Sequence, residues 1–231
     1  MIAVGELSAG LAHEIRNPLG LIRSYIYIIR KKISDMENLR HPLNVIDDSV
    51  DRINNLIENL LGFSRLSVER SSLVNVPQLV RSIVALEHKN LEKNGIEIRQ
   101  EFSLEHGASM MLNEDVLKLT LVNLMNNSID ALVASGKERK EISIRVYTCG
   151  EQLRIDFRDN GVGIEKDVLE TVFDPFFTTK ETGTGLGLYI LNSELRRING
   201  TITAESTAGV ETVFHISIPL EMGKEEQDGT E

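Results

Sequence analysis

A carboxylate followed by two glycines, in the segment Asp159-Asn160-Gly161-Val162-Gly163, could hold a flat ligand that carries an amine. The segment ends the alternating run 152–159, so Asp159 is expected at the end of a strand. There its carboxylate can accept a hydrogen bond from an exocyclic amine such as that of adenine, while Gly161 and Gly163 let the backbone approach the ring. Taken alone, the motif is more often a plain turn, because Asn-Gly is a strong turn signal.

A second glycine-rich segment, Gly183-Thr184-Gly185-Leu186-Gly187-Leu188, leads directly into a helix predicted over about 186–198. Uncrowded amides at a helix N-terminus bind phosphate. The glycines follow no strand and the chain has no GxxxxGK[ST], so neither the dinucleotide fingerprint nor the P-loop applies. By itself the segment could be a flexible loop with a helix cap. The predicted phosphate-binding residues are Thr184, Gly185, Leu186, Gly187 and Leu188.

The segment 173–180, with sequence FDPFFTTK, places an aromatic cluster and a cation between these two motifs. Lys180 stands three residues before the glycines, where its ammonium group can reach phosphate. The segment is therefore predicted to form a lid. The alternative is a loop that its phenylalanines pin in the core.

Two asparagines, Asn123 and Asn127, lie four residues apart in a predicted helix from about 113 to 134. Residues at this spacing share one helix face, so two carboxamides project side by side. Mg²⁺ that bridges phosphates takes few protein ligands and prefers hard oxygen, which makes Asn127 the predicted metal ligand. Simple solvation of the pair is the alternative.

Two long helices are predicted from Ile2 to about Ser67. Apolar residues recur every three or four positions from Leu7 to Ile33, and again from Leu43 to Leu60 after His41-Pro42. Two such stripes cannot be buried by touching only each other, so two copies of the hairpin are expected to form a four-helix bundle. The chain is therefore predicted to be a homodimer. The alternative is a hairpin packed onto the rest of its own chain.

Strands and helices alternate after residue 72 and predict a two-layer α/β sandwich. A helix is expected over 77–94, strands over 96–102, 141–147 and 152–159, and a closing pair of strands in ITAES and TVFHISI. The predicted domains are a helical hairpin at 1–68, a linker at 69–75, an ATP-binding domain at 76–220 and a disordered tail at 221–231.

Composition restricts the class of protein. The 231 residues carry 25 basic and 35 acidic side chains, a net charge of −10, which argues against a nucleic-acid partner. The single cysteine, Cys149, fits a reducing compartment, so the chain is expected in the cytoplasm. No apolar run approaches the roughly 18 residues of a membrane span, and the first ten residues lack a basic signal-peptide head. The chain is expected neither to cross a membrane nor to be exported.

The order of five motifs resembles the two-component sensor histidine kinases. HEIRNPL at 13–19, NLMNN at 123–127, DNGVG at 159–163, FDPFFTTK at 173–180 and GTGLGL at 183–188 are similar to the H, N, G1, F and G2 boxes of that family. The likeness covers about residues 1–220, and the H box is similar to the nitrogen-regulation branch. The resemblance implies a dimerisation and histidine-phosphotransfer hairpin, followed by an ATP-binding domain of the Bergerat type.

The resemblance also implies roles for individual residues. His13 would be the phosphoacceptor, Glu14 its acid/base neighbour and Asn17 part of a phosphatase motif. Asp159 would hold the adenine amine of ATP. Asn127 would bind Mg²⁺ with Asn123 near the phosphates, and the glycines and Lys180 would shape the pocket and lid.

The chemistry of His13 fits that role. A neutral imidazole has a lone pair that can attack a γ-phosphorus if a neighbour such as Glu14 accepts or orients the proton on the other nitrogen. Pro18 removes the amide that would bond to the carbonyl of Glu14, so a bend is expected one turn past His13. The remaining histidines are interpreted as lacking such carboxylate and asparagine partners, and surface or strand positions are predicted for His41, His88, His106 and His215.

Three positions depart from the family pattern. Asn113 stands where aspartate is commoner, Gly200-Thr201 replaces a glycine pair, and Glu211 replaces a glycine, which is expected to strain the turn between the last two strands.

The resulting hypothesis is a histidine kinase core that phosphorylates itself on His13 and passes the phosphoryl group to a response-regulator aspartate. An upstream sensor region, soluble or membrane-attached, is expected before residue 1. The alternatives are a nucleotide-sensing binding module and a Bergerat-type ATPase that performs conformational work.

Overall fold

The computed structural model describes residues 17–29, 42–46, 49–50, 53, 71–105, 107–180 and 183–220. They fall into two compact units. One contains the residues before Leu66 together with Val172–Ile190. The other contains Leu66–Thr171 and the residues from Leu191 onward. Each unit is described by itself.

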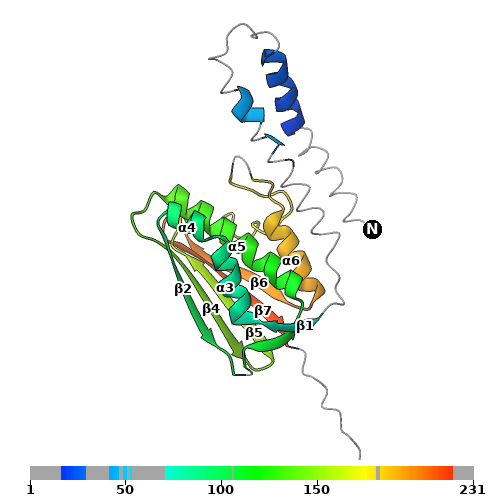
Figure 1. The fold of residues 1–231 in the computed structure, drawn as a ribbon, viewed down its shortest axis with the longest axis vertical. Helices are drawn as coiled ribbons and strands as arrows, with labels where there is room; N and C mark the ends of the chain where they lie inside the picture. The colour runs from blue at the N-terminus through cyan, green and yellow to red at the C-terminus, as the bar shows by residue number, and fades with distance from the viewer. Residues whose placement is uncertain are drawn as a thin grey trace, which may run out of the picture. The chain divides into compact units, whose positions relative to one another are not determined.

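A five-stranded mixed sheet forms one layer of the second unit (Figure 1). The strand order is β2-β4-β5-β7-β6, in which β2 runs parallel to β4 and all other neighbours are antiparallel. Alternation of buried and exposed residues along β4 and β5 matches the predicted strands. The strands are β2 (Ile96–Ser103), β4 (Lys140–Cys149), β5 (Gln152–Asp159), β6 (Thr201–Thr207) and β7 (Glu211–Pro219).

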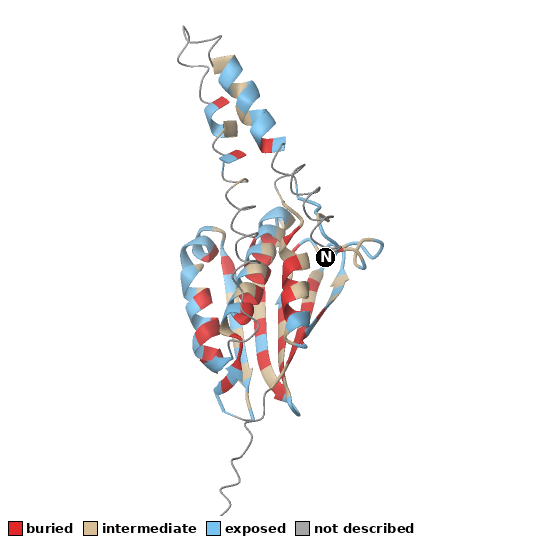
Figure 2. Ribbon diagram, turned by 90° about the vertical axis from the view of Figure 1, so that its right-hand side faces the viewer, coloured by how far each residue is buried: buried red, intermediate tan, exposed pale blue. Residues whose placement is uncertain are grey.

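Helices form the second layer and cover one face of the sheet (Figure 2). α5 (Glu114–Ser135) contacts β4 and β5, and its buried apolar residues include Leu117, Leu121, Leu124, Ile129 and Leu132. The side chain of Asn113 caps α5 by accepting a hydrogen bond from the Val116 amide at 3.0 Å, and Gly136 ends it with a left-handed φ of +61°. This two-layer arrangement confirms the predicted α/β sandwich. The other helices are α3 (Val76–Leu86), α4 (His88–Lys93) and α6 (Gly187–Arg197), which belongs to this unit from Leu191.

Two features differ from the prediction. The helix expected over 77–94 is broken at Glu87, whose backbone leaves helical geometry (φ −88°, ψ 0°) between α3 and α4. The predicted linker 69–75 contains β1 (Ser72–Asn75), which pairs antiparallel with β3 (Ser109–Leu112). Both strands have only four residues, which is too short for an alternating pattern to identify them.

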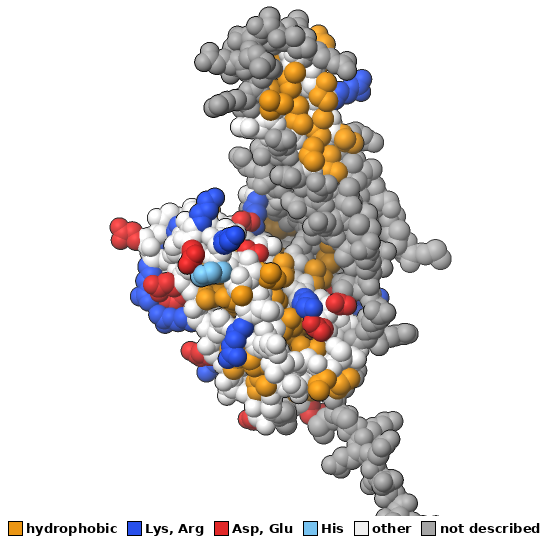
Figure 3. All heavy atoms as spheres, in the orientation of Figure 1, with side chains coloured by type: hydrophobic (Ala, Val, Ile, Leu, Met, Phe, Trp, Pro, Cys, Tyr) orange, Lys and Arg blue, Asp and Glu red, His pale blue; other side chains and the backbone are white. Residues whose placement is uncertain are grey.

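In the first unit, residues 17–29 and 42–46 are helical, as the sequence predicts. Apolar side chains on these segments are exposed, and Figure 3 shows them as a hydrophobic surface. A helix with the length and apolarity needed to cross a bilayer does not occur among the residues that the structure describes. The exposed apolar residues include Leu19, Leu21, Ile26, Leu43 and Val50.

Candidate functional site

Asp159 lies at the end of β5, and its side chain points into the layer between sheet and helices. Only 3% of its surface is exposed. The Ser128 hydroxyl on α5 donates a hydrogen bond to Asp159 Oδ2 at 2.7 Å, and the Gly161 amide donates to Oδ1 at 2.9 Å. These two bonds fix the plane of the carboxylate. A carboxylate can accept about four hydrogen bonds, so both oxygens keep acceptor capacity for a ligand amine.

Burial raises the pKa of Asp159 above its ordinary value, because the charged form loses its hydration. The hydrogen bonds from Ser128 and Gly161 and the charge of Lys137 oppose this shift, and the charge of Glu211 adds to it. The carboxylate of Asp159 is thus buried in an apolar layer, where the Ser128 hydroxyl and the Gly161 amide donate hydrogen bonds to it. An ionised Asp159 in such a layer is a strong acceptor for a neutral amine donor.

Gly161 and Gly163 are required by contacts within the protein. A Cβ on Gly161 would lie 2.8 Å from the Cβ of Ala131 on α5. Gly163 has a φ of +68°, and a Cβ there would overlap the carbonyl oxygen of Thr207. The sequence interpretation assigned these glycines to a close approach of ligand and backbone. The structure gives a further reason, since they let the loop pass close to α5 and to the end of β6.

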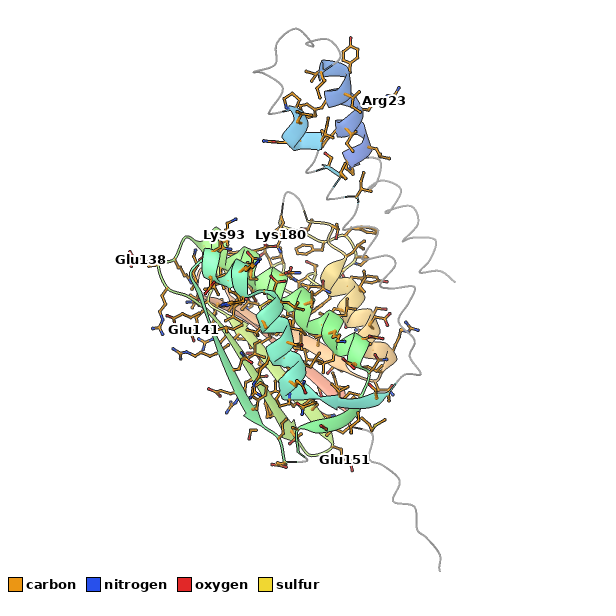
Figure 4. The ribbon with its side chains drawn as sticks, viewed as in Figure 1. Arg23, Lys93, Glu138, Glu141, Glu151 and Lys180 are labelled. Carbon is orange, nitrogen blue, oxygen red and sulfur yellow. The ribbon has the colours of Figure 1, made fainter. Side chains whose placement is uncertain are left out.

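Asn160 and Ser128 are functional candidates that the sequence reasoning missed. The Asn160 side chain accepts a hydrogen bond from the Glu141 amide at 2.8 Å and donates one to the Arg139 carbonyl at 3.0 Å. It therefore ties the loop after β5 to the start of β4, where Figure 4 labels Glu141. A polar residue between Asp159 and Gly161, and a buried serine directly after Asn127, were the available signals.

Asn123 and Asn127 are half-buried and share a face of α5, as predicted. The Asn123 amide nitrogen donates to the Leu119 carbonyl at 3.0 Å, so its side-chain oxygen remains an acceptor. Asn127 directly precedes Ser128, which contacts Asp159. The structure thus brings both asparagines into the unit that contains Asp159.

The described residues contain no group of three or more His, Cys, Asp or Glu side chains that could hold a metal ion. A metal at this site would need an amide oxygen and oxygens of a ligand. That requirement suits Mg²⁺, which binds proteins through few side chains together with phosphate. The carboxamide donors of α5 therefore fit the predicted ion.

The predicted lid and glycine-rich residues belong to the first unit, so the structure places them relative to one another and not relative to Asp159. Gly185 has a φ of +65°, and a Cβ there would overlap the backbone of Phe176, which itself has a positive φ of 66°. The Thr184 hydroxyl accepts a weak hydrogen bond of 3.4 Å from the Leu186 amide, and α6 begins at Gly187 and Leu188. Leu186 is buried, and Lys180, labelled in Figure 4, is exposed.

His13 and Glu14 lie outside the described residues, as do His41 and His106. Asn17 is described, and it is an exposed residue of the helical segment 17–29. The role of the predicted H box therefore stays a prediction.

The two other histidines have carboxylate neighbours that the sequence reasoning did not find. On β7, His215 Nδ1 lies 2.7 Å from Asp156 Oδ1, and its Nε2 lies 3.9 Å from Glu205. On α4, His88 Nε2 lies 3.2 Å from Glu92. The predicted strand position of His215 and surface position of His88 are confirmed. The prediction that these two histidines have no carboxylate partner is wrong. Strand pairing places Asp156 directly opposite His215.

Glu211 does not strain the turn between β6 and β7. The positive φ of that turn, +73°, falls on Gly209, and Glu211 is already the first residue of β7. Its carboxylate accepts a hydrogen bond from Arg158 Nε at 2.9 Å. The expected strain is therefore wrong. Of the other departures, Asn113 caps α5, and a Cβ on Gly200 would lie 3.0 Å from the Ser217 carbonyl oxygen.

A pocket on the outer face of the sheet is lined by Arg99, Arg139 and Arg158, with Glu141, Ser143 and Asn160. Arg158 directly precedes Asp159 in β5, so its side chain lies on the opposite face. Glu141 is 3.3 Å from both Arg99 and Arg139, and Glu211 pairs with Arg158. The pocket is separate from the Asp159 site, and its cations are ion-paired.

Two family models match the chain. The model described as histidine kinase-, DNA gyrase B-, and HSP90-like ATPase matches residues 112–222, which include Asp159 and both glycine-rich segments. The model described as the His Kinase A (phospho-acceptor) domain matches residues 3–69. Together the two models cover the sandwich from α5 onward and the predicted hairpin.

Individual proteins resemble nearly the whole chain. The signal transduction histidine-protein kinase AtoS of Escherichia coli is 35% identical over 223 residues, which are 95% of this chain and 35% of AtoS. Sporulation kinase E of Bacillus subtilis is 28% identical over 99% of this chain and 30% of its own length. The crystal structure of histidine kinase ThkA in complex with response regulator protein TrrA superposes with a TM-score of 0.75 at 27% identity, over 94% of this chain and 62% of that chain. The chain spans about a third of the length of AtoS and of sporulation kinase E.

Proposed function

Because the chain belongs to the two-component sensor histidine kinases, we propose that it phosphorylates itself on His13 with ATP and passes the phosphoryl group to a response-regulator aspartate. The observation that carries the proposal is the buried carboxylate of Asp159, held by Ser128 and Gly161. It offers adenine's amine an oriented acceptor within the matched ATPase region. The complex of ThkA with a response regulator supports the choice of partner.

Each residue contributes positioning or charge, as phosphoryl transfer requires. Asp159 accepts the adenine amine, and Lys180 with Thr184–Leu188 binds the phosphates. Asn127, with Asn123 nearby, would hold Mg²⁺, and the ion would supply charge neutralisation for the phosphates when bound. The lone pair of His13 forms the new bond to the γ-phosphorus as the bond to the bridging oxygen breaks, and Glu14 orients the proton on the other imidazole nitrogen.

The proposal keeps the hairpin at 1–68 and extends the predicted ATP-binding domain, 76–220, to include β1, because β1 pairs with β3. It assigns residues 172–190 to the ATP-binding domain, because the ATPase match runs through them without interruption. The H box is taken as the nitrogen-regulation type on the strength of HEIRNPL. The core would work in the cytoplasm, where ATP and response regulators meet.

Two rival functions share the nucleotide site. A nucleotide-sensing module would bind ATP without transferring phosphate, and a Bergerat-type ATPase would release inorganic phosphate. Incubation with labelled ATP and Mg²⁺ separates the three. A histidine kinase accumulates acid-labile, base-stable label on the protein, whereas neither rival does.

The hairpin should make the protein a dimer of two 25.8 kDa chains. Exposed apolar side chains at Leu19, Ile26, Leu43 and Val50 are what a four-helix bundle would bury. Replacing Ile53 with Asp places a charge in the predicted seam, which should dissociate or unfold the dimer, because burying an unpaired charge is strongly unfavourable. Light scattering measures the mass of each variant.

The matched control is Leu86→Asp, since Leu86 is 79% exposed on α3 in the sandwich and lies outside the predicted seam. That variant should remain a dimer. A monomeric mass for the unmodified chain would contradict the four-helix bundle.

Asn17 should serve dephosphorylation of the regulator more than autophosphorylation. It stands four residues after His13, the spacing of one helical turn, and its carboxamide can both donate to and accept from a water held in line with an aspartyl phosphate. We expect Asn17→Ala to keep kinase activity within a few-fold and to lower phosphatase activity by roughly 10²-fold, the scale of losing one positioning group. Phosphate release from purified phosphorylated regulator measures the second activity.

Asn44→Ala is the matched control, because Asn44 is also an exposed asparagine in a helical part of the hairpin. It should keep both activities. Equal loss of both activities in Asn17→Ala would indicate that Asn17 only prepares the turn before Pro18, and undiminished phosphatase activity would exclude the water-positioning role.

A further inference from the structure

Lys137 makes three hydrogen bonds to backbone carbonyls at the edge of the nucleotide site. Its Nζ donates to the carbonyl oxygens of Asn160 at 2.7 Å, Gly161 at 3.1 Å and Val210 at 2.9 Å. The left-handed turn at Gly136 directs the chain away from the end of α5 just before Lys137. An ammonium group has three donors, so these contacts use all of them.

The three carbonyls come from two different loops. Asn160 and Gly161 belong to the loop after β5, and Val210 belongs to the turn between β6 and β7. Neutral backbone bonds also join these loops, since the Gly209 amide donates to the Val162 carbonyl at 2.6 Å. Lys137 adds charge-assisted bonds, which are stronger than neutral ones. The ammonium group therefore links the loop after β5 to the turn between β6 and β7.

The loop after β5, which Lys137 holds, contains the Gly161 amide that orients the carboxylate of Asp159. The Gly161 carbonyl is held by Lys137, and the Gly161 amide donates to Asp159 Oδ1 at 2.9 Å. The Val162 amide donates to the Ala131 carbonyl of α5 at 3.3 Å, which anchors the following residue. Movement of the loop away from Lys137 would withdraw the Gly161 amide from Asp159.

We propose that Lys137 is a positioning residue for adenine recognition, which holds the Gly161 peptide so that Asp159 stays aimed at the exocyclic amine. The assignment rests on the proposed ATP-binding function. Lys137 contacts the protein backbone and acts on the ligand only through Asp159. Its removal should therefore weaken recognition of the amine and leave binding of the phosphates unchanged.

The test compares Lys137→Met with Lys140→Met in the full chain. Lys140 is a matched control, because its Nζ donates to a single carbonyl, that of Asn94 at 3.2 Å, on the connection between α4 and β2. ATP affinity of Lys137→Met should fall about 10-fold, the scale of losing charge-assisted bonds at a half-buried side chain. Lys140→Met should bind ATP as the unmodified chain does. Titration calorimetry measures both affinities, and thermal unfolding checks the fold.

A second nucleotide separates positioning from general loosening of the site. Purine riboside triphosphate lacks the exocyclic amine, so Asp159 has nothing to recognise. The unmodified chain should prefer ATP over this analogue. In Lys137→Met the preference should shrink about 10-fold while affinity for the analogue stays the same. A purely structural role would lower both affinities together.

The pH profile gives an independent readout. The charged groups that act on Asp159 are Lys137, which lowers its pKa, and Glu211 of β7, which raises it. Removing the Lys137 charge raises the pKa of Asp159 further, so protonation begins at a higher pH. Since only the ionised carboxylate accepts the amine without donating, the acidic limb of ATP binding should move to higher pH in Lys137→Met.

An unchanged preference for ATP over the analogue in Lys137→Met would overturn the assignment. If that variant unfolds, Lys137→Gln, which keeps two amide donors without the charge, replaces it in the same comparison and should show the smaller preference. Failure of the unmodified chain to bind ATP would instead overturn the proposed function, and the assignment with it.

Discussion

Asp159→Asn is expected to lower ATP affinity about 5- to 150-fold, which corresponds to about 1–3 kcal/mol. The carboxamide keeps the shape of the side chain but replaces one acceptor oxygen with an NH₂ donor. Both oxygens of Asp159 already accept a bond, from Ser128 and from Gly161, and the adenine amine needs a third acceptor position. An NH₂ group in place of Oδ1 would face the Gly161 N–H donor, whereas one in place of Oδ2 could donate to the Ser128 hydroxyl. In either orientation only one oxygen remains as an acceptor for the other donors.

Asp156→Asn is the matched control for this prediction. Asp156 lies three residues earlier on β5, with its side chain on the outer face of the sheet beside His215. The same chemical change there should leave ATP affinity within about twofold, the range of a surface substitution away from the ligand. Titration calorimetry with both variants measures the effect. Equal affinities of the two variants for ATP would place the adenine site elsewhere.

Local patterns in the sequence predicted most of the sandwich. The alternation in 141–147 and 152–159 arises because one face of the sheet is buried under α5, and this requirement is visible in either strand alone. The limits of α5 follow from Asn113 and Gly136, whose side chain and backbone freedom cap the helix. Such signals lie within a few residues of the elements they define.

Pairings between distant segments could not be predicted in this way. β1 and β3 have four residues each, and they become strands only because they meet each other. After the break at Glu87, α4 contacts β2, which is distant from α3 in the chain. Neither feature leaves a periodic pattern in a single segment.

In the candidate site, too, local features were predicted and contacts between distant segments were not. Asp159 was identified from its place after a strand and before two glycines. Its partner Ser128 is 31 residues away in sequence, and the contact depends on how α5 lies across β5. Likewise, the pair formed by His215 and Asp156 depends on the register of β5 and β7, which the composition of neither strand specifies.

The register of β5 and β7 also bears on which histidine receives phosphate. His215 has a carboxylate at 2.7 Å from Nδ1 and another at 3.9 Å from Nε2, so both ring nitrogens face acids. An anionic phosphoryl group approaching either nitrogen would meet negative charge. His88 is paired with Glu92 on an exposed helix. A neighbouring carboxylate alone therefore does not identify the histidine that accepts the phosphoryl group.

His13→Gln should abolish autophosphorylation and leave ATP affinity nearly unchanged. Glutamine has no imidazole lone pair to attack the γ-phosphorus, and transfer has no other route if His13 is the acceptor. ATP affinity should persist, because Asp159 and its partners belong to the sandwich. Acid-labile, base-stable label from ATP and Mg²⁺ measures the first effect, and titration calorimetry measures the second.

His215→Gln and His88→Gln are the matched controls, and both should incorporate label as the unmodified chain does. Asp159→Asn completes the set, because it keeps His13 and removes the adenine acceptor, so label should fall with ATP occupancy and recover at high ATP concentration. His13→Gln should not recover at any ATP concentration, since it lacks the nucleophile. Label that persists in His13→Gln but disappears in His215→Gln would transfer the phosphoacceptor role from the hairpin to β7.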